Sequence, residues 1–171
     1  IACKEVGINV DFCKLPEQTK EEDLLELISE LNENPKVHSI LVQLPLPKHL
    51  DENKIIEAIT PEKDVDGLHP KNFGKLVEGD ESIVPCTPKG IIRMFEHEGI
   101  DVEGKYVVII NHSKIVGKPL FLMMLNRDAT VTVCHAKTKN LVQHTKQADI
   151  LISAVGKPCF IKKDMVKKGV V

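Results

Sequence analysis

The most restrictive feature of this sequence is an apolar strand that leads through a short polar loop into an apolar helix. Tyr106–Ile110 is a continuous apolar run, largely β-branched, which is typical of a strand buried on both faces in a parallel sheet. The polar loop Asn111–Val116 follows, and Gly117–Leu125 has the composition of a buried helix. Such a corner often binds an anion in α/β proteins, because the first helical amides point outward and the helix dipole favours negative charge. The alternative is an ordinary loop between strand and helix.

Strands and helices alternate through the second half of the chain. The pattern predicts, in order, strand 105–110, helix 117–126, strand 129–134, helix 139–147, strand 149–155, a short helix near 163–168 and the start of a strand at 169. Such alternation implies right-handed β–α–β units around a parallel sheet. The second half is therefore predicted to be a Rossmann-type domain.

The first half also alternates. The predicted elements are strand 8–15, a helix with Thr19 as N-cap that ends before Asn32–Pro35, strand 37–43, a helix from Asp51 to Ala58, and a helix from Thr87–Pro88 to Gly99. Residues 1–7 have the pattern of a last helical turn closed by Gly7. We therefore predict an α/β fold of two three-layer domains, 1–87 and 88–171, in a chain that is either a fragment or the ordered part of a longer protein.

Composition excludes several classes of function. A net charge of −2 provides no electrostatic attraction for nucleic acid or an anionic membrane surface. Aromatic residues make up 4% and tryptophan is absent, which disfavours a platform for single-stranded nucleic acid. No apolar run approaches membrane-spanning length. The five cysteines are scattered singly, which argues against a zinc site and indicates a reducing compartment, the cytoplasm.

The first half contains two candidate polar sites. Gln43 ends a predicted strand just before Pro45, and open α/β sheets bind ligands at the carboxyl ends of their strands. Its amide either hydrogen-bonds a substrate or catalytic group, or faces water. Asp64 and Asp66 lie in one loop and either orient a heterocycle or form polar turns. A metal is disfavoured because no third acidic ligand stands at a suitable spacing.

The second half offers polar groups around its first loop. Ser113 can donate to a phosphate, Lys114 and Lys118 are nearby positive charges, and His112 lies in the same loop. His135 follows the next predicted strand, where it either meets a cofactor or caps the following helix. The dinucleotide fingerprint GxGxxG is absent, so local sequence alone does not separate a nucleotide site from an ordinary loop.

Four motifs occur in one order: Leu-Val-Gln-Leu-Pro-Leu-Pro at 41–47, Pro-Glu-Lys-Asp-Val-Asp-Gly at 61–67, Pro-Cys-Thr-Pro-Lys-Gly at 85–90 and Ser-Lys-Ile-Val-Gly-Lys-Pro at 113–119. Together they closely resemble the bifunctional methylenetetrahydrofolate dehydrogenase/methenyltetrahydrofolate cyclohydrolase family, over the whole length of the chain. The resemblance implies oxidation of 5,10-methylenetetrahydrofolate with NADP and hydrolysis of the methenyl product to 10-formyltetrahydrofolate. It also implies a place in one-carbon metabolism and purine biosynthesis, and a homodimer.

The resemblance assigns roles to particular residues. Gln43 would hydrogen-bond the catalytic lysine and Asp66 would hold the pteridine ring, so both are predicted to be catalytic, while Val42 and Leu44 would line the folate site. The predicted cofactor-binding residues are Asn111, His112 and Ser113 at the adenosine 2′-phosphate, together with Val116, Gly117, His135, Ala136, Thr138 and Gly156. No metal is predicted.

The chain also departs from the family pattern. The family's catalytic lysine would precede residue 1 and its Pro-Gly-Gly-Val-Gly-Pro loop is absent, so residues 1–171 alone are expected not to turn over substrate. Many members have Gly-Arg-Ser where this chain has Asn111-His112-Ser113, and a serine is common at Ala136. Histidine attracts a phosphate by charge only when protonated. NADP binding is therefore expected to be weakened and to tighten below neutral pH, with NAD as an alternative cofactor.

Three other functions remain open from the sequence. The first is a dehydrogenase without the hydrolase step, using NAD or NADP. The second is a catalytically silent assembly domain, which the presence of Gln43 and Asp66 disfavours. The third is a general α/β nucleotide-binding module, which the folate-side motifs disfavour.

Overall fold

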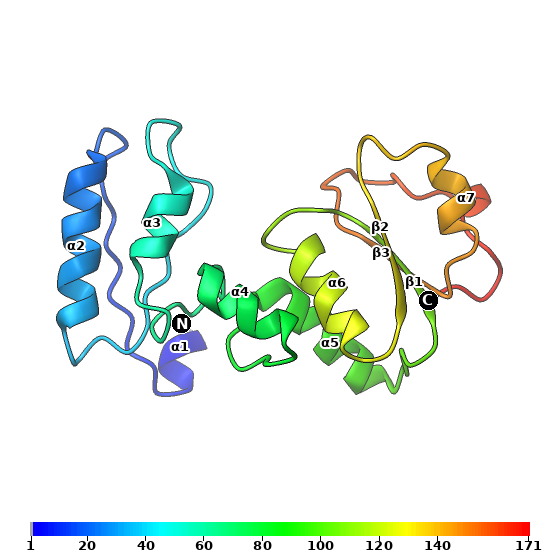
Figure 1. Ribbon diagram of the computed structural model, residues 1–171, viewed down its shortest axis with the longest axis horizontal. Helices are drawn as coiled ribbons and strands as arrows, with labels where there is room; N and C mark the ends of the chain where they lie inside the picture. Colours follow the sequence, from blue (N-terminus) through cyan, green and yellow to red (C-terminus); the bar gives the residue numbers. More distant parts are fainter. Residues whose placement is uncertain (1) are drawn as a thin grey trace.

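The computed structural model describes residues 2–171 and shows an elongated α/β protein with two lobes (Figure 1). The elements are α1 (Ala2–Glu5), α2 (Glu21–Glu33), α3 (Glu52–Ala58), α4 (Pro70–Val77), α5 (Cys86–Glu98), β1 (Tyr106–Ile110), α6 (Gly117–Leu125), β2 (Thr130–Cys134), α7 (Leu141–Thr145), β3 (Ile150–Ser153) and the 3-10 turn η1 (Lys163–Met165). Helices α2 and α3 form the first lobe, the three strands lie in the second, and α4 lies between them. The α/β class is confirmed.

β1 is the central strand of a parallel sheet with the order β2-β1-β3. Its last residue, Ile110, lies opposite Cys134 of β2 and Ser153 of β3. Val107 and Ile109 pack in a core with α4, α5 and α6, whereas the alternate residues of the strand pack in a second core on the opposite face of the sheet, with residues of α7 and the C-terminal segment. Burial on both faces explains why the strand is an unbroken apolar run.

The remaining elements of the second lobe follow the predicted order with shifted boundaries. Helix α7 is shorter than the predicted helix 139–147, and the helix expected near 163–168 is a single 3-10 turn. The predicted strand start at 169 is supported by two backbone hydrogen bonds. The Val171 amide donates to the Asp149 carbonyl at 3.0 Å, and the Leu151 amide donates to the Val171 carbonyl at 2.8 Å. Val171 therefore lies beside the start of β3, although the sheet itself has three strands.

The first lobe is held by helix packing. The buried core consists of Leu24, Ile28, Ile40, Ile55, Ile56 and Ile59. Asp51 caps α3 by accepting two amides of its first turn, as predicted. The ammonium of Lys63 donates to three carbonyls at the C-terminal end of α2, at 2.6–2.9 Å. A cation at this end also opposes the negative pole of the helix.

The two strands predicted in the first lobe are not regular strands. Residues 8–15 are extended and exposed, and residues 37–43 contribute only Ile40, which lies opposite Asp64 in an isolated parallel bridge. Alternating apolar residues indicate a segment that can bury one of its two faces. A regular strand also needs a neighbouring strand that hydrogen-bonds to its backbone. Phe12 is 85% exposed, so the described residues provide no such neighbour for this segment.

Helix starts differ from the predicted caps. Helix α2 begins after Lys20, because the Thr19 hydroxyl donates to the Pro16 carbonyl instead of capping the helix. Helix α5 begins at Cys86, so Thr87 lies inside its first turn and is not the N-cap. Proline is accepted throughout a first turn, which makes its position a poor marker of the exact start. The helical end predicted at residues 1–7 is seen from Ala2, while Ile1 lies outside the described residues.

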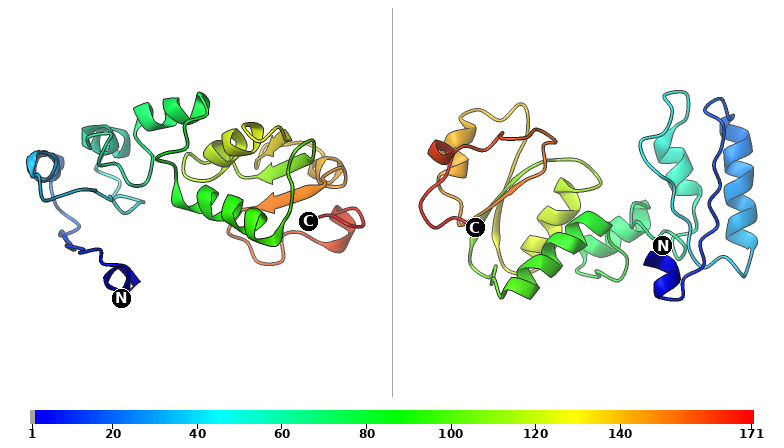
Figure 2. Two further views of the ribbon diagram at one scale, coloured as in Figure 1. Left: turned by 90° about the horizontal axis from the view of Figure 1, so that it is seen from below. Right: turned by 180° about the vertical axis from the view of Figure 1, so that it is seen from behind.

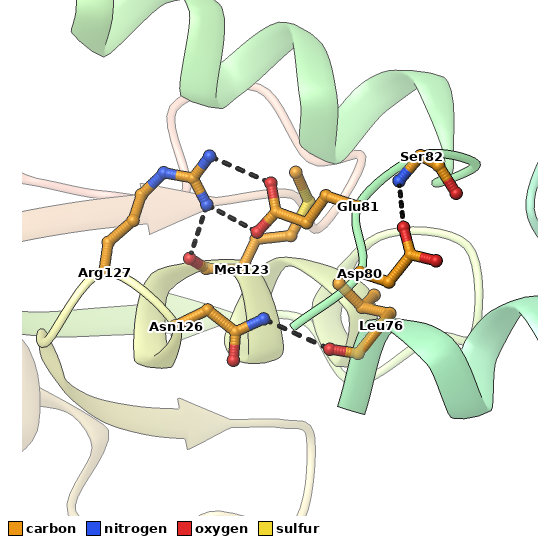
Figure 3. A network of polar contacts seen from close by, with 7 residues as sticks. All are labelled: Leu76, Asp80, Glu81, Ser82, Met123, Asn126 and Arg127. Carbon is orange, nitrogen blue, oxygen red and sulfur yellow. Dashed lines mark hydrogen bonds and ion pairs between the residues drawn. The ribbon is translucent and has the colours of Figure 1, made fainter. Parts of the chain in front are cut away.

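Helix α4 was not predicted and is important for the arrangement of the lobes. Its Leu76 lies in the second lobe's core. In Figure 3, the Asn126 side chain donates to the Leu76 carbonyl at 3.1 Å, next to a two-pronged ion pair between Arg127 and Glu81 at 2.6 and 2.9 Å. The Arg127 guanidinium also donates to the Met123 carbonyl. These contacts fasten α4 and the α4–α5 connection to the C-terminal end of α6.

Figure 2 shows from two further sides that α4 and α5 connect the lobes. No helix among the described residues is long and apolar enough to cross a membrane. The predicted division into domains 1–87 and 88–171 stays a prediction, to which the structure adds that α4 packs on the second lobe.

Candidate active site

The corner between β1 and α6 is organised by the side chain of Asn111. Its Oδ1 accepts the amides of Ser113 at 2.7 Å and Gly117 at 3.0 Å, and its Nδ2 donates to the Ala154 carbonyl at 2.7 Å, just beyond β3. A Cβ on Gly117 would lie 2.1 Å from the Asn111 carbonyl oxygen, so only glycine permits this approach. The Asn111 side chain therefore shapes the loop and joins two strand ends.

The first amides of α6 are not free to bind an anion. The Gly117 amide donates to Asn111 and the Lys118 amide to the Ser113 carbonyl at 3.0 Å. Pro119 has no amide hydrogen, and the preceding Val116 amide donates to Ser113 Oγ at 3.1 Å. The loop itself satisfies these N–H groups, so the alternative in which the helix start binds an anion has no free donor among the amides of residues 116–118. Side chains at this corner can still donate to an anion.

Two imidazole rings lie together at this corner. The ring centroids of His112 and His135 are 5.0 Å apart, with the planes tilted by 51°. The His135 Nδ1 accepts the Lys137 amide at 3.1 Å, which leaves Nε2 as the ring nitrogen available to a ligand. The Ser113 hydroxyl accepts one amide and still has its own proton to donate. Together they form a donor set that suits a phosphate.

The other predicted cofactor residues lie along the same sheet edge, because parallel strands end on one side. Thr138 closes the loop after β2 by accepting the His135 amide at 2.8 Å, and Ala136 is exposed and offers only a methyl group. Val116 is half-buried at the start of α6. Gly156 follows β3 with a φ of +65°, a conformation that favours glycine.

Lys114 reaches away from this corner. Its ammonium donates to Asn53 Oδ1 of α3 at 2.7 Å. The loop after β1 is therefore in direct contact with the first lobe. The Lys114 ammonium, expected to be a positive charge near a bound anion, instead hydrogen-bonds Asn53 of that lobe.

The folate-side candidates lie on the chain that passes the Ile40–Asp64 bridge. Gln43 is exposed and its amide donates only to the neighbouring Leu44 carbonyl at 3.0 Å, so it is available to another group. Val42 packs against the first lobe's core, and Leu44 is half-buried. The segments that follow Ile40 and Asp64 run in the same direction from the bridge, so Gln43 and Asp66 lie on the same side of it. No hydrogen bond joins their side chains in the described part of the protein.

The two carboxylates of this loop have different surroundings in the structure. Asp64 is 1% exposed, and its Oδ2 accepts the His69 amide at 2.8 Å and the Asn72 side chain at 2.9 Å. Asp64 is therefore a structural group. Asp66 is half-buried, and burial raises its pKa while a contact with the Cys86 thiol lowers it. Across residues 2–171, no cluster of three or more possible metal ligands is found.

Cys86, which the sequence did not single out as a site residue, lies next to Asp66. Its Sγ lies 3.7 Å from Asp66 Oδ1. The sequence carried one relevant signal, its position in the Pro-Cys-Thr-Pro motif at the start of α5, but twenty residues separate it from Asp66.

Comparison with known proteins matches both halves of the chain to one enzyme family. Residues 1–66 match the catalytic-domain model of the tetrahydrofolate dehydrogenase/cyclohydrolase family, and residues 85–171 match its NAD(P)-binding domain model. The chain is 54% identical over 170 residues to the Bifunctional protein FolD of Moorella thermoacetica, covering 99% of this chain and 61% of that protein.

Two solved structures show the same fold. The bifunctional FolD dehydrogenase/cyclohydrolase from Campylobacter jejuni has a TM-score of 0.96 at 49% identity, covering 99% of this chain and 61% of that one. The Trypanosoma brucei enzyme, in complex with NADP cofactor and inhibitor, has a TM-score of 0.92 at 36% identity, covering 97% and 57%. The chain thus spans about 60% of the length of these relatives.

The fold defines a two-lobed α/β protein whose second lobe has a Rossmann-type parallel sheet and matches an NAD(P)-binding domain model. The chain belongs to the tetrahydrofolate dehydrogenase/cyclohydrolase family.

Proposed function

We propose that this protein oxidises 5,10-methylenetetrahydrofolate and hydrolyses the resulting methenyl form to 10-formyltetrahydrofolate, in one-carbon metabolism that serves purine biosynthesis. The observation that carries the proposal is the direct contact between the lobes at Lys114 and Asn53, 2.7 Å long. It brings the loop of the dinucleotide corner against the lobe that contains Gln43. This contact supports the proposal that substrate and cofactor bind close to each other.

The folate-side residues have suitable chemistry for their proposed roles. Asp66 is a half-buried carboxylate, and a carboxylate accepts two N–H bonds from the edge of a pteridine. Gln43 offers both a donor and an acceptor, as a residue that orients a catalytic lysine needs. Val42 and Leu44 provide apolar surface beside it.

The donor set at the β1–α6 corner fits a phosphate-bearing dinucleotide. The Ser113 hydroxyl and the two imidazoles would bind the adenosine 2′-phosphate, while Asn111 and Gly117 fix the loop that carries them. When bound, NADP would supply the hydride acceptor that the protein's side chains lack. The chain's own contribution is to bind it and to orient the folate beside it.

One observation favours a second candidate, a dehydrogenase with relaxed cofactor choice. By the family resemblance, His112 stands at a position that is arginine in many members, and Ala136 has no hydroxyl to donate. An arginine is charged at all working pH values and binds phosphate with two hydrogen bonds, whereas histidine does neither. NADP and NAD dissociation constants, measured at pH 6 and 8, test this candidate. An NADP affinity that is equal at both pH values would contradict a role for protonated histidine.

The main test follows both reactions on the full-length protein. Oxidation of methylenetetrahydrofolate is measured with NADP and with NAD, and hydrolysis of methenyltetrahydrofolate is measured separately. Gln43→Ala is expected to lower both rates by at least about 100-fold, the usual scale for a group that supports proton transfer. Gln18→Ala, at an exposed glutamine of the first lobe, is the matched control and should change neither. Unchanged rates in Gln43→Ala would remove Gln43 from the site.

We further propose a cytoplasmic homodimer, on the basis of the family resemblance. The five cysteines are all unpaired in the structure, which supports a reducing compartment. Sedimentation equilibrium would measure the mass of the assembly, and a monomer at micromolar concentration would contradict the homodimer.

A further inference from the structure

We propose that Cys86 is a positioning residue whose thiol donates a hydrogen bond to Asp66 and so fixes the carboxylate that receives the pteridine. The proposal rests on the proposed function for the identity of the ligand. Its geometric basis, the pairing of Cys86 with Asp66, is independent of that function.

The contact between Cys86 and Asp66 is built into the backbone. Gly67 has a φ of +64°, and a Cβ placed on it would lie 2.7 Å from the Cα of Val84. The loop before α4 and the residues before α5 therefore touch main chain to main chain. Cys86 follows this contact by two residues and Asp66 precedes it by one. The result is a distance of 3.7 Å between Cys86 Sγ and Asp66 Oδ1, within reach of a thiol hydrogen bond.

The protonation states suit a thiol donor and a carboxylate acceptor. Burial raises the pKa of Cys86, and the neighbouring Asp66 carboxylate raises it further, while Lys89 opposes this shift. The thiol is therefore protonated at neutral pH. Burial and the Asp64 charge raise the pKa of Asp66, while the hydrogen bond from Cys86 lowers it. The thiol thus favours the charged acceptor that a pteridine requires.

The thiol is the one hydrogen-bond donor that reaches the Asp66 carboxylate within residues 2–171. The lone pairs that it does not use remain for a ligand. Cys86 is also the first residue of α5, the helix that leads into the second lobe. The Cys86 thiol, at the start of the helix that leads into the second lobe, therefore positions the Asp66 carboxylate on the folate side.

The first test does not depend on catalysis. Alkylation of each cysteine by iodoacetamide is followed against pH and assigned by peptide mass spectrometry. Asp66→Asn removes the negative charge and leaves a neutral amide oxygen as a weaker acceptor, so the alkylation of Cys86 should have its midpoint at lower pH than in the parent protein. Cys13, exposed in the first lobe, serves as the internal control and should not shift. An unchanged Cys86 midpoint would overturn the pairing, whether or not the protein turns over folates.

The second test separates positioning from packing. Cys86→Ala should raise the KM for methylenetetrahydrofolate by about five- to tenfold, as expected for the loss of one hydrogen bond of ordinary strength, since a thiol is a weak donor. The KM for NADP should stay unchanged, and the acid limb of the folate pH profile should move to higher pH. Cys86→Ser keeps a donor and should restore most of the affinity. Equal defects in both variants, or equal falls in melting temperature with no change in the pH profile, would show a packing role instead.

Discussion

Replacing Gly117 with alanine would place a methyl group against backbone that has no room to move. A Cβ on Gly117 would lie 2.1 Å from the Asn111 carbonyl oxygen and 2.4 Å from its carbon. Ordinary contacts of such an atom begin at 3.4 Å, so the loop and α6 would have to separate by roughly 1.3 Å, the difference between 3.4 and 2.1 Å. No side-chain rotation relieves this contact, because both partners are main chain.

The cost of this substitution can be estimated from two opposing effects. Overpacking costs about 1–3 kcal/mol, and the upper value applies here because the obstacle is backbone. Alanine is favoured over glycine in a helix by about 1 kcal/mol. The free energy of unfolding should therefore fall by about 2 kcal/mol, which lowers the melting temperature of a chain of this length by about 4–8 °C.

Gly90→Ala is the matched control. Gly90 lies inside α5, and a Cβ there would meet nothing within 4 Å. This variant should be more stable than the parent by up to about 1 kcal/mol. Thermal and urea unfolding followed by circular dichroism, with NADP affinity measured by calorimetry, compares the two. Gly117→Ala should also lose NADP affinity, whereas Gly90→Ala should keep it. Equal stabilities of the two variants would refute the reasoning, since they would show that the backbone around Gly117 can shift at no cost in free energy.

Two further predictions concern charges. Asp66→Asn should abolish folate turnover and raise the melting temperature at neutral pH. The melting temperature rises because a raised pKa means that the folded state disfavours the Asp66 charge. This stabilisation should shrink as the pH falls toward the ordinary carboxyl pKa of 3.8. A melting temperature that does not rise at pH 7 would contradict it. In a double-mutant cycle, Arg127→Met with Glu81→Gln should show a coupling of about 1–2 kcal/mol, because the pair in Figure 3 is two-pronged and partly buried. The exposed pair Arg93 and Glu96 should give at most about 0.5 kcal/mol, and equal couplings would show that burial adds nothing.

Much of the second lobe follows from local sequence. The apolar run Tyr106–Ile110 and the helix after Gly117 were identified by their composition, because a strand buried on both faces excludes polar residues along its whole length. The first lobe was less predictable. Residues 8–15 alternate as a strand does, but a strand exists only where a neighbour supplies a ladder. Helix α4 was missed because its burial depends on contact with α6, far along the chain.

The candidate site divides in the same way. The sequence by itself determined which residue types stand at the sheet edge, and its motifs made Gln43 and Asp66 candidates for the folate side. Only the tertiary structure decided that Asn111 and the loop use up the first amides of α6, and that His112 meets His135. The approach of Cys86 to Asp66 was likewise decided by packing. The physical reason is that helix and strand periods are local properties, whereas hydrogen-bond partners are chosen among groups that folding brings together across many residues.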